Sequence, residues 1–412
     1  MAARFPAHGY NLVAGQAISV FGDYAARTAL VLFVLDRTGS AFGVGIMMMI
    51  NSLPAIIGLS AGYLTARHPI KRLLVVYCSL SAFLSLAMIT FTGDLVSLPA
   101  IYLVYFMLAL MSSLFVPTRL AFVAEVIPKE ALKTFNSLDQ TLEAVVMSLG
   151  IVTAGYLYTF LGVEFVFVVN AVSFLALALA IGTVRAAGVQ DVKGPGAAAR
   201  GRQEGLARTF RLALANPQLL FLTLGVGASG LAVGVVTTMF VIFVRKELGG
   251  TNIDFSQVSS VRALVSSLVG FGFVLSLFRI SERTMIISGY LAMGCSIAAM
   301  ALCRSLGLVF LWNVFIGAAN VLYYIGTRTL LQKSGDPESR TNLFALQAAV
   351  MRLCLVAGAG LSGLLADVLG LRASWELMFA AAIFGVVGSW GALALPRGET
   401  PASGAGATRT AA

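Results

Sequence analysis

The chain has 412 residues, of which 58% are apolar and only 11% are charged, and its formal net charge is +10. A soluble protein needs about a quarter of its residues charged to cover its surface. This composition therefore excludes a soluble enzyme, a nucleic-acid-binding protein and a disordered chain. Apolar stretches of about 18 or more residues also lack the short alternating pattern of a membrane β-barrel. We expect an all-α membrane protein.

Twelve apolar runs are each long enough for a transmembrane helix, which needs about 20 residues. Most are separated by short turns such as Gly93-Asp94 and Leu161-Gly162, so consecutive helices are expected to be antiparallel neighbours. The expected spans are 10–35, 41–66, 73–92, 98–118, 137–159, 164–184, 218–244, 255–278, 284–303, 306–327, 343–369 and 375–395.

One connection is longer and divides the spans six and six. Residues 185–217 are rich in Gly, Ala and Arg, a composition that cannot bury a core and is typical of a flexible linker. We expect an N-terminal six-helix bundle over 1–184, a cytoplasmic linker over 185–217 and a C-terminal six-helix bundle over 218–396. The Gly- and Ala-rich tail over 397–412 is expected to be disordered and cytoplasmic.

The distribution of Lys and Arg predicts the orientation in the membrane. With both termini inside, the cytoplasmic segments carry about 20 of the 28 basic residues and the outer loops about 5. We expect a multi-pass protein of the cell membrane with both termini cytoplasmic, and basic loops that contact anionic lipids at that face. The N-terminus lacks the pattern of a removable signal peptide.

The two halves repeat one another. Residues 31–39 (VLFVLDRTG) align with 241–249 (VIFVRKELG) at an offset of 210, Thr118-Arg119 with Thr327-Arg328 at 209, and Gly155 with Gly363 at 208. Six spans repeated in the same orientation predict two bundles related by an axis along the membrane normal. Proteins built in this way hold a site between the bundles near the middle of the membrane.

Asp23 and Arg27 lie near the middle of the first span, one helical turn apart. A charge at the bilayer centre costs roughly 2.5–3.5 kcal/mol on insertion scales, so each needs a reason. One interpretation is an ion pair that neutralises itself. The other, which we favour, is that Asp23 carries a proton, with Arg27 or a substrate beside it controlling its charge.

Asp139 and Glu143 are also one turn apart, at the inner end of the fifth span. Two carboxyl groups this close raise each other's proton affinity unless a cation intervenes. Asp139 is expected at the interface and in contact with water, or else within the proton-coupling group. Glu143 lies deeper, as a proton carrier or as a structural partner.

Arg262 and Arg352 are cations of the second half with no carboxylate one turn away. Each either faces a cavity and attracts an anionic substrate, or braces the bundles against Glu143, Asp139 or a helix C-terminus. Asn51 and Gln347 either line the pathway or bond between helices. Arg119 and Arg328, equivalent in the repeat, are expected to reach the inner interface or to bind anionic headgroups.

No nucleotide-binding loop and no spacing of metal ligands occurs in the sequence, which argues against ATP-driven transport. We expect no enzymatic activity, cofactor or metal ion. The four cysteines lie in apolar runs without a C-x-x-C pair and are expected to pack as small apolar residues.

Several short motifs occur in the order found in one transporter family. The chain resembles the major facilitator superfamily, and most closely its twelve-span drug:proton antiporter branch, which includes macrolide-efflux-like and siderophore-exporter-like proteins. The motifs are 15–23 (GQAISVFGD), 38–41 (TGSA), Leu53-Pro54, 116–119 (VPTR), 127–132 (IPKEAL), 329–332 (TLLQ) and 336–340 (DPESR).

The loop between the second and third spans departs from the family pattern. The resemblance assigns a cytoplasmic gating loop to Gly62, Arg67, Lys71 and Arg72, but Ala66 stands where the family has an acidic residue. In the family that carboxylate ties the bundles together, so its loss predicts a weaker inner gate or another latch. The fifth span, 150–155 (GIVTAG), lacks the proline of the exporter signature.

These features favour a monomeric secondary transporter that exports a drug-like or amphipathic small molecule in exchange for protons by alternating access. An alternative keeps the fold but moves an anionic metabolite or a lysophospholipid, and is motivated by the arginines within the spans. A third interpretation is a membrane scaffold or sensor that does not transport, since two family motifs are degraded.

Overall fold

The computed structural model describes residues 7–54, 68–93, 98–128, 130–184, 217–274, 280–333 and 337–393. All regular secondary structure in these ranges is helical. Eight of their helices are long and apolar enough to cross a membrane. Helices are favoured because the bilayer core offers no partner for backbone polar groups, and a helix satisfies them within one segment.

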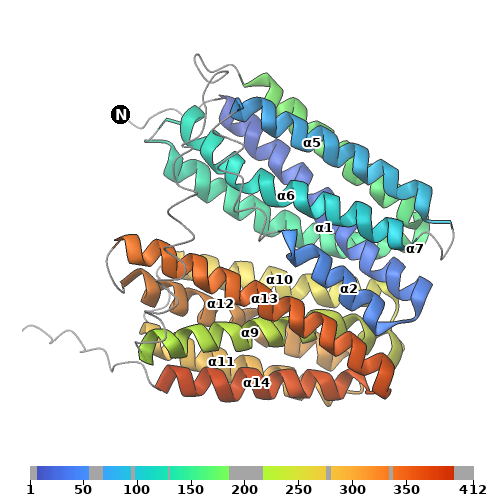
Figure 1. The fold of residues 1–412 in the computed structure, drawn as a ribbon, viewed down its shortest axis with the longest axis vertical. Helices are drawn as coiled ribbons and strands as arrows, with labels where there is room; N and C mark the ends of the chain where they lie inside the picture. Colours follow the sequence, from blue (N-terminus) through green and yellow to red (C-terminus); the bar gives the residue numbers. More distant parts are fainter. Residues whose placement is uncertain are drawn as a thin grey trace, which may run out of the picture.

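In the first half the described residues form five α-helices and one short 3₁₀ segment (Figure 1). The 52-residue α7 would be about 78 Å long if straight, far beyond the ~30 Å apolar core of a bilayer. It breaks at Gly162, whose φ of 81° favours glycine, where the sequence predicts a turn between two spans. The elements are α1 (Ala7–Thr38), α2 (Ala41–Ser52), α5 (Ile70–Ala87), η2 (Met88–Phe91), α6 (Leu98–Val126) and α7 (Leu132–Thr183).

In the part of the second half that the structure describes there are six α-helices, and a π-helical turn follows the first of them. They are α9 (Pro217–Ile242), η5 (Phe243–Glu247), α10 (Asn252–Val274), α11 (Glu282–Ala301), α12 (Leu306–Lys333), α13 (Pro337–Leu369) and α14 (Ala373–Leu393). The predicted linker up to residue 216, the predicted tail and the predicted second span beyond Pro54 lie outside the described residues, whereas Pro217, the last residue of the predicted linker, begins α9.

Helices pack mostly within their own half of the sequence. In the first half α7 packs against α1 and α5, and in the second half α9 packs against α13 and α14 (Figure 1). Between the halves, α2 packs against α13 and α7 against α10. Large apolar side chains such as Phe83, Phe160 and Leu179 are at least 66% exposed, as expected of surfaces that face lipid.

The contact between α2 and α13 requires glycine. A Cβ atom on Gly45 would lie 2.6 Å from the carbonyl oxygen of Ala359, and one on Gly363 would lie 2.7 Å from that of Ala41. Helix backbones approach this closely only where side chains are absent. The halves are therefore in backbone contact at the region formed by residues 36–45, 245–257 and 359–367, which we call the closed end.

Charged side chains reinforce the closed end. Asp367 of α13 accepts hydrogen bonds from the backbone amides of Ala41 (3.0 Å) and Phe42 (2.9 Å) and from the Ser40 hydroxyl, so it caps the N-terminus of α2 from the other half. A helix N-terminus favours a negative charge. Arg245 forms an ion pair with Asp36 at 2.7 Å across the same boundary.

A second ion pair joins α6 to α7 inside the first half. Arg119 Nη2 lies 2.5 Å from Asp139 Oδ1, and their side chains are 13% and 7% exposed. The expectation that Asp139 is solvated at the interface is therefore wrong, and Arg119 does not reach away to the interface. Two neighbouring helices meet here, so each charge finds a partner closer than bulk water.

Replacing Asp367 by alanine is expected to loosen the closed end, because the amides at the start of α2 lose their acceptor. Loss of a helix cap costs about 1 kcal/mol, or about a fivefold shift in population. Spin labels at Thr90 and Leu302, one on each half, report the separation of the halves by double electron–electron resonance. In Asp367→Ala, a larger fraction of molecules should have a longer distance between the two labels. Asp254→Ala is the matched control, because Asp254 caps α10 within its own half. An unchanged distance distribution in Asp367→Ala would contradict the latch.

Removing Arg119 is expected to destabilise the protein more than removing the whole pair. Arg119→Met leaves the Asp139 carboxylate buried without a cation, which costs about 3–5 kcal/mol for a buried ion pair. Arg119→Met/Asp139→Asn removes the charge as well and is expected to recover most of the stability. Thermal unfolding in detergent measures both variants, and a double variant no more stable than the single one would refute a structural ion pair.

Candidate functional site

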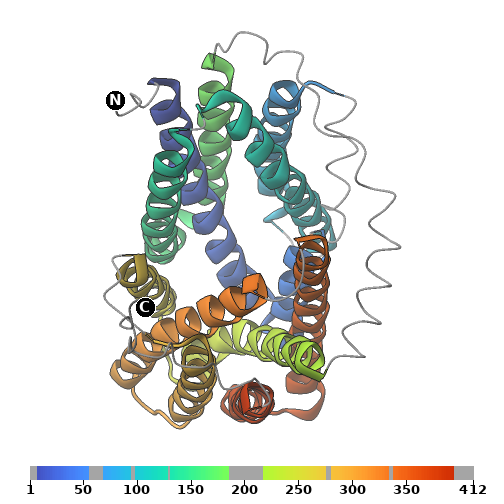
Figure 2. The same cartoon turned by 90° about the vertical axis from the view of Figure 1, so that its left-hand side faces the viewer.

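A cavity of about 380 Å³ lies between α1, α5, α6 and α7 of the first half and α13 of the second. Viewed from the end that carries the N-terminus, these helices stand around the centre of the molecule (Figure 2). Four of the charged residues predicted for the site line this cavity. They are Asp23, Arg27, Glu143 and Arg352.

Asp23 and Arg27 form the ion pair that their spacing on α1 predicts. Arg27 Nη2 donates to Asp23 Oδ2 at 3.1 Å, and the guanidinium also lies over the Tyr24 ring, 5.2 Å from its centroid. The two side chains are 34% and 32% exposed, so the pair is in contact with the cavity rather than sealed in the protein. A pair in this position is neutral yet reachable by a ligand or a proton.

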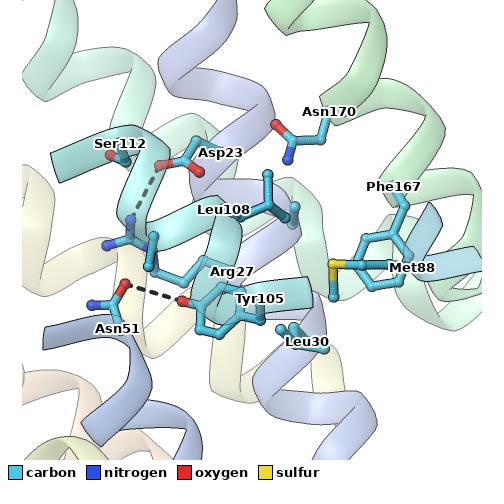
Figure 3. Close-up of a pocket in the computed structure, with 12 residues that line it drawn as sticks. Asp23, Arg27, Leu30, Asn51, Met88, Tyr105, Leu108, Ser112, Phe167 and Asn170 are labelled. Atoms are coloured by element: carbon cyan, nitrogen blue, oxygen red, sulfur yellow. Dashed lines mark hydrogen bonds and ion pairs between the residues drawn. The ribbon is translucent and has the colours of Figure 1, made fainter. Parts of the chain in front are cut away.

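A smaller cavity of about 20 Å³ adjoins the first, and Asp23, Arg27 and Ser112 line both. In Figure 3, Asp23 lies on one side of the Arg27 guanidinium, and Asn51 and Tyr105 lie on the other. The Tyr105 hydroxyl donates to Asn51 Oδ1 at 3.0 Å. Asn51 thus lies beside the charged pair, and its carbonyl oxygen accepts a hydrogen bond from α6, which is the alternative of a bond between helices.

Glu143 and Arg352 face the main cavity from α7 and α13, on opposite halves. Glu143 is half-buried, and Arg352 is exposed. Among the residues that the structure describes, neither side chain has an oppositely charged group within 4.0 Å. The alternative in which Arg352 braces the halves against Glu143 or Asp139 is not observed. The cavity therefore holds one carboxyl group and one guanidinium without an ion-pair partner.

Other predicted residues lie elsewhere. The guanidinium of Arg262 on α10 packs over the ring of Phe240 on α9, 5.5 Å from its centroid, and does not line this cavity. Gln347 lines a different cavity within the second half. Stacking on an aromatic ring stabilises Arg262 without a carboxylate.

The gating-loop residues are only partly described. Lys71 Nζ donates to the backbone carbonyls of Gly182 and Val184 at 2.9 and 2.8 Å, which ties the start of α5 to the end of α7. Arg72 is exposed. Gly62 and Arg67 lie outside the described residues.

The main cavity also contains uncharged polar residues, and of these Tyr77 was not singled out from the sequence. Gln16 Oε1 and the Tyr77 hydroxyl are buried and have no hydrogen-bond partner within the described residues, and both line the main cavity. On α1 a signal was present, because Gln16, Asp23 and Arg27 recur at helical spacing along one face. Within the described ranges no group of three His, Cys, Asp or Glu residues is placed to hold a metal ion.

Comparisons with known proteins agree on one family. The family model described as Major Facilitator Superfamily matches residues 12–278. Macrolide efflux protein A of Streptococcus pyogenes is 24% identical over 380 residues, covering 90% of this chain and 91% of that protein. An uncharacterized MFS-type transporter of Bacillus subtilis, YvqJ, is 21% identical and covers 86% of this chain and 84% of its own length.

Solved structures show the same fold. A bacterial homologue of the iron transporter ferroportin in an inward-facing state superposes with a TM-score of 0.75 at 16% identity, covering 93% of this chain and 98% of that one. The nucleoside transporter NupG also gives 0.75, at 12% identity, covering 94% of this chain and 98% of its own. The apolar helices, the arrangement of the fold and the family match lead to one conclusion: this chain belongs to the Major Facilitator Superfamily and is a multi-pass membrane transporter.

Proposed function

We propose that the protein is a secondary transporter that exports an amphipathic, drug-like compound in exchange for protons. The observation that carries this proposal is the main cavity, which is lined by the Asp23–Arg27 pair and by Glu143 and Arg352, two charged residues without an ion-pair partner among the described residues. Charges in a membrane-spanning protein that lack partners mark pathways for ions or substrates. The cavity is lined by both halves, as transport between them requires.

The rest of the cavity wall suits an amphipathic cargo. Apolar side chains such as Phe115, Phe174 and Leu177 line it together with the polar groups. Ligand sites of this kind use apolar walls for affinity and a few polar groups for orientation. The similarity to a macrolide efflux protein supports export of such a compound.

Glu143 is the stronger proton carrier in this conformation, with Asp23 as its partner in coupling. Asp23 already has a cation, whereas Glu143 has none within 4.0 Å among the described residues. A carboxylate in an apolar setting becomes neutral by taking up a proton when no cation is near. Asp139 stays a prediction as a member of this group, and its ion pair with Arg119 favours a structural role.

We further propose twelve crossings in two bundles, 1–184 and 218–396, joined by the linker 185–217 and followed by a disordered tail over 397–412. The bundles would rock about the cavity, with the closed end toward the outside and both termini in the cytoplasm. The contacts of helices within each half support this arrangement, as does the charge bias of the loops. We propose that a monomer in the cell membrane, with anionic lipids at its cytoplasmic face, is sufficient.

Arg352 favours a second candidate cargo. A guanidinium that faces the cavity without a carboxylate would bind a carboxylate or phosphate of an anionic metabolite or lysophospholipid. Purified protein in liposomes, driven by a pH gradient, separates the two candidates by flux. Uptake of a macrolide that a panel of organic anions does not inhibit supports drug efflux, whereas inhibition by the anions supports the second candidate.

Neutralising Glu143 is expected to uncouple transport from protons. In proteoliposomes, Glu143→Gln should lose the flux that a pH gradient drives by about tenfold or more, the size of a typical coupling free energy. Asp23→Asn should fold, insert and show the same loss. Exchange of labelled for unlabelled substrate without a gradient should persist in both, because the cavity remains.

The matched control is Glu164→Gln, an exposed carboxyl group on the same helix as Glu143 that does not line the cavity. It should transport like the unaltered protein. Gradient-driven flux that is undiminished in both Glu143→Gln and Asp23→Asn would remove these residues from proton coupling.

A further inference from the structure

A third cavity, of about 130 Å³, lies within the second half, between α9, α12 and α13. Its lining shares no residue with the cavity that holds Asp23. Apolar groups such as Val226 and Met351 form part of the wall. The polar part consists of Thr327 and Arg328 on α12 and Gln347 on α13.

Two buried donors in this cavity are unsatisfied. Thr327 and Gln347 are each 6% exposed, and neither Thr327 Oγ1 nor Gln347 Nε2 has a hydrogen-bond partner within the part of the chain that the structure describes. Buried polar groups in native proteins are nearly always hydrogen-bonded. A hydroxyl and an amide nitrogen that lack acceptors indicate a ligand that supplies acceptor atoms.

The third polar group gives the ligand its charge. The Arg328 guanidinium lies over the ring of Tyr324, 4.6 Å from its centroid, and no carboxylate of the described residues lies within 4.0 Å of it. A guanidinium held over an aromatic ring still carries N–H groups that can donate hydrogen bonds to a ligand. Guanidinium edges match carboxylate and phosphate oxygens.

The internal repeat indicates that a carboxylate is absent from this cavity. At the offsets of 208 and 209 that relate the two halves, Arg328 corresponds to Arg119, and Gln347 corresponds to Asp139. In the first half these positions form the buried ion pair at 2.5 Å. In the second half a neutral amide, one methylene longer than Asp, stands in place of the carboxylate, so Arg328 has no carboxylate within 4.0 Å among the described residues.

We propose that this cavity is an anion site, in which an external phosphate or carboxylate group takes the place that Asp139 fills in the first half. Arg328 supplies the charge, and Gln347 and Thr327 donate hydrogen bonds to the anion's oxygens. The group is carried by an acidic phospholipid headgroup or by a soluble anion. The site stands apart from the transport cavity, and the proposal does not rest on the proton-coupled function.

The test uses the full-length protein in nanodiscs of neutral phosphatidylcholine. The thermal unfolding midpoint is measured against added phosphatidylglycerol in one series and against inorganic phosphate in another, with sodium chloride at matched ionic strength as the reference. A ligand that binds the folded state raises the midpoint in a saturable way. A rise with phosphatidylglycerol alone assigns a lipid headgroup, and a rise with phosphate as well assigns a soluble anion.

The decisive variant is Gln347→Asp, which restores the carboxylate of the first half. It is expected to unfold at a higher temperature than the unaltered protein without anion, and to lose the response to anion by about tenfold or more in apparent affinity, the size expected for a charge-assisted hydrogen bond. Arg328→Gln should lose the same response without that gain. Arg304→Gln changes an exposed arginine that precedes the first residue of α12, and this variant should respond like the unaltered protein.

Two results would overturn the proposal. The first is that neither phosphatidylglycerol nor phosphate raises the unfolding midpoint of the unaltered protein in a saturable way beyond the sodium chloride reference. The second is that Gln347→Asp responds to the anion with the same apparent affinity as the unaltered protein, because the anion would then bind elsewhere.

Discussion

A charge within an apolar membrane must be neutralised, solvated or capped, and this constraint organises the polar parts of the structure. The protein meets it within one helix in α1, between neighbouring helices α6 and α7, and at a helix N-terminus through Asp367. Glu143 and Arg352 use none of these solutions and face a cavity instead. A functional role is expected for charged residues of this kind, which can be stabilised only by water or a ligand in the cavity.

The same constraint makes contact between the halves uneven along the membrane. At the closed end, glycines allow backbones to touch and charged groups complete the contact, as Gly45 and Asp367 illustrate. Separating the halves there would expose unsatisfied helix amides together with a carboxylate. The halves are thus joined by specific contacts at the closed end and are separated by a cavity farther along α1. Alternating access needs such contacts, because they must form in one state and break in the other.

The sequence predicted features that depend on local spacing and missed those that depend on packing between helices. Apolar runs predicted the helices, Gly162 the turn inside α7, and the spacing of Asp23 and Arg27 their ion pair. Arg119 and Asp139 lie 20 positions apart on two helices, so no periodicity relates them. Arg262 illustrates the same limit, because its partner is an aromatic ring of another helix rather than a charge.

The duplicated halves have diverged most where charge is concerned. At the offset of 208 that relates Gly155 to Gly363, Asp139 and Glu143 of α7 align with Gln347 and Met351 of α13, neither of which is acidic. Loss of both acids leaves Arg328 and the donors around it without an internal anion, while Arg352 projects into the shared cavity. The asymmetry therefore separates the roles that we propose: titratable groups in the first half exchange protons, and uncompensated cations in the second bind anions.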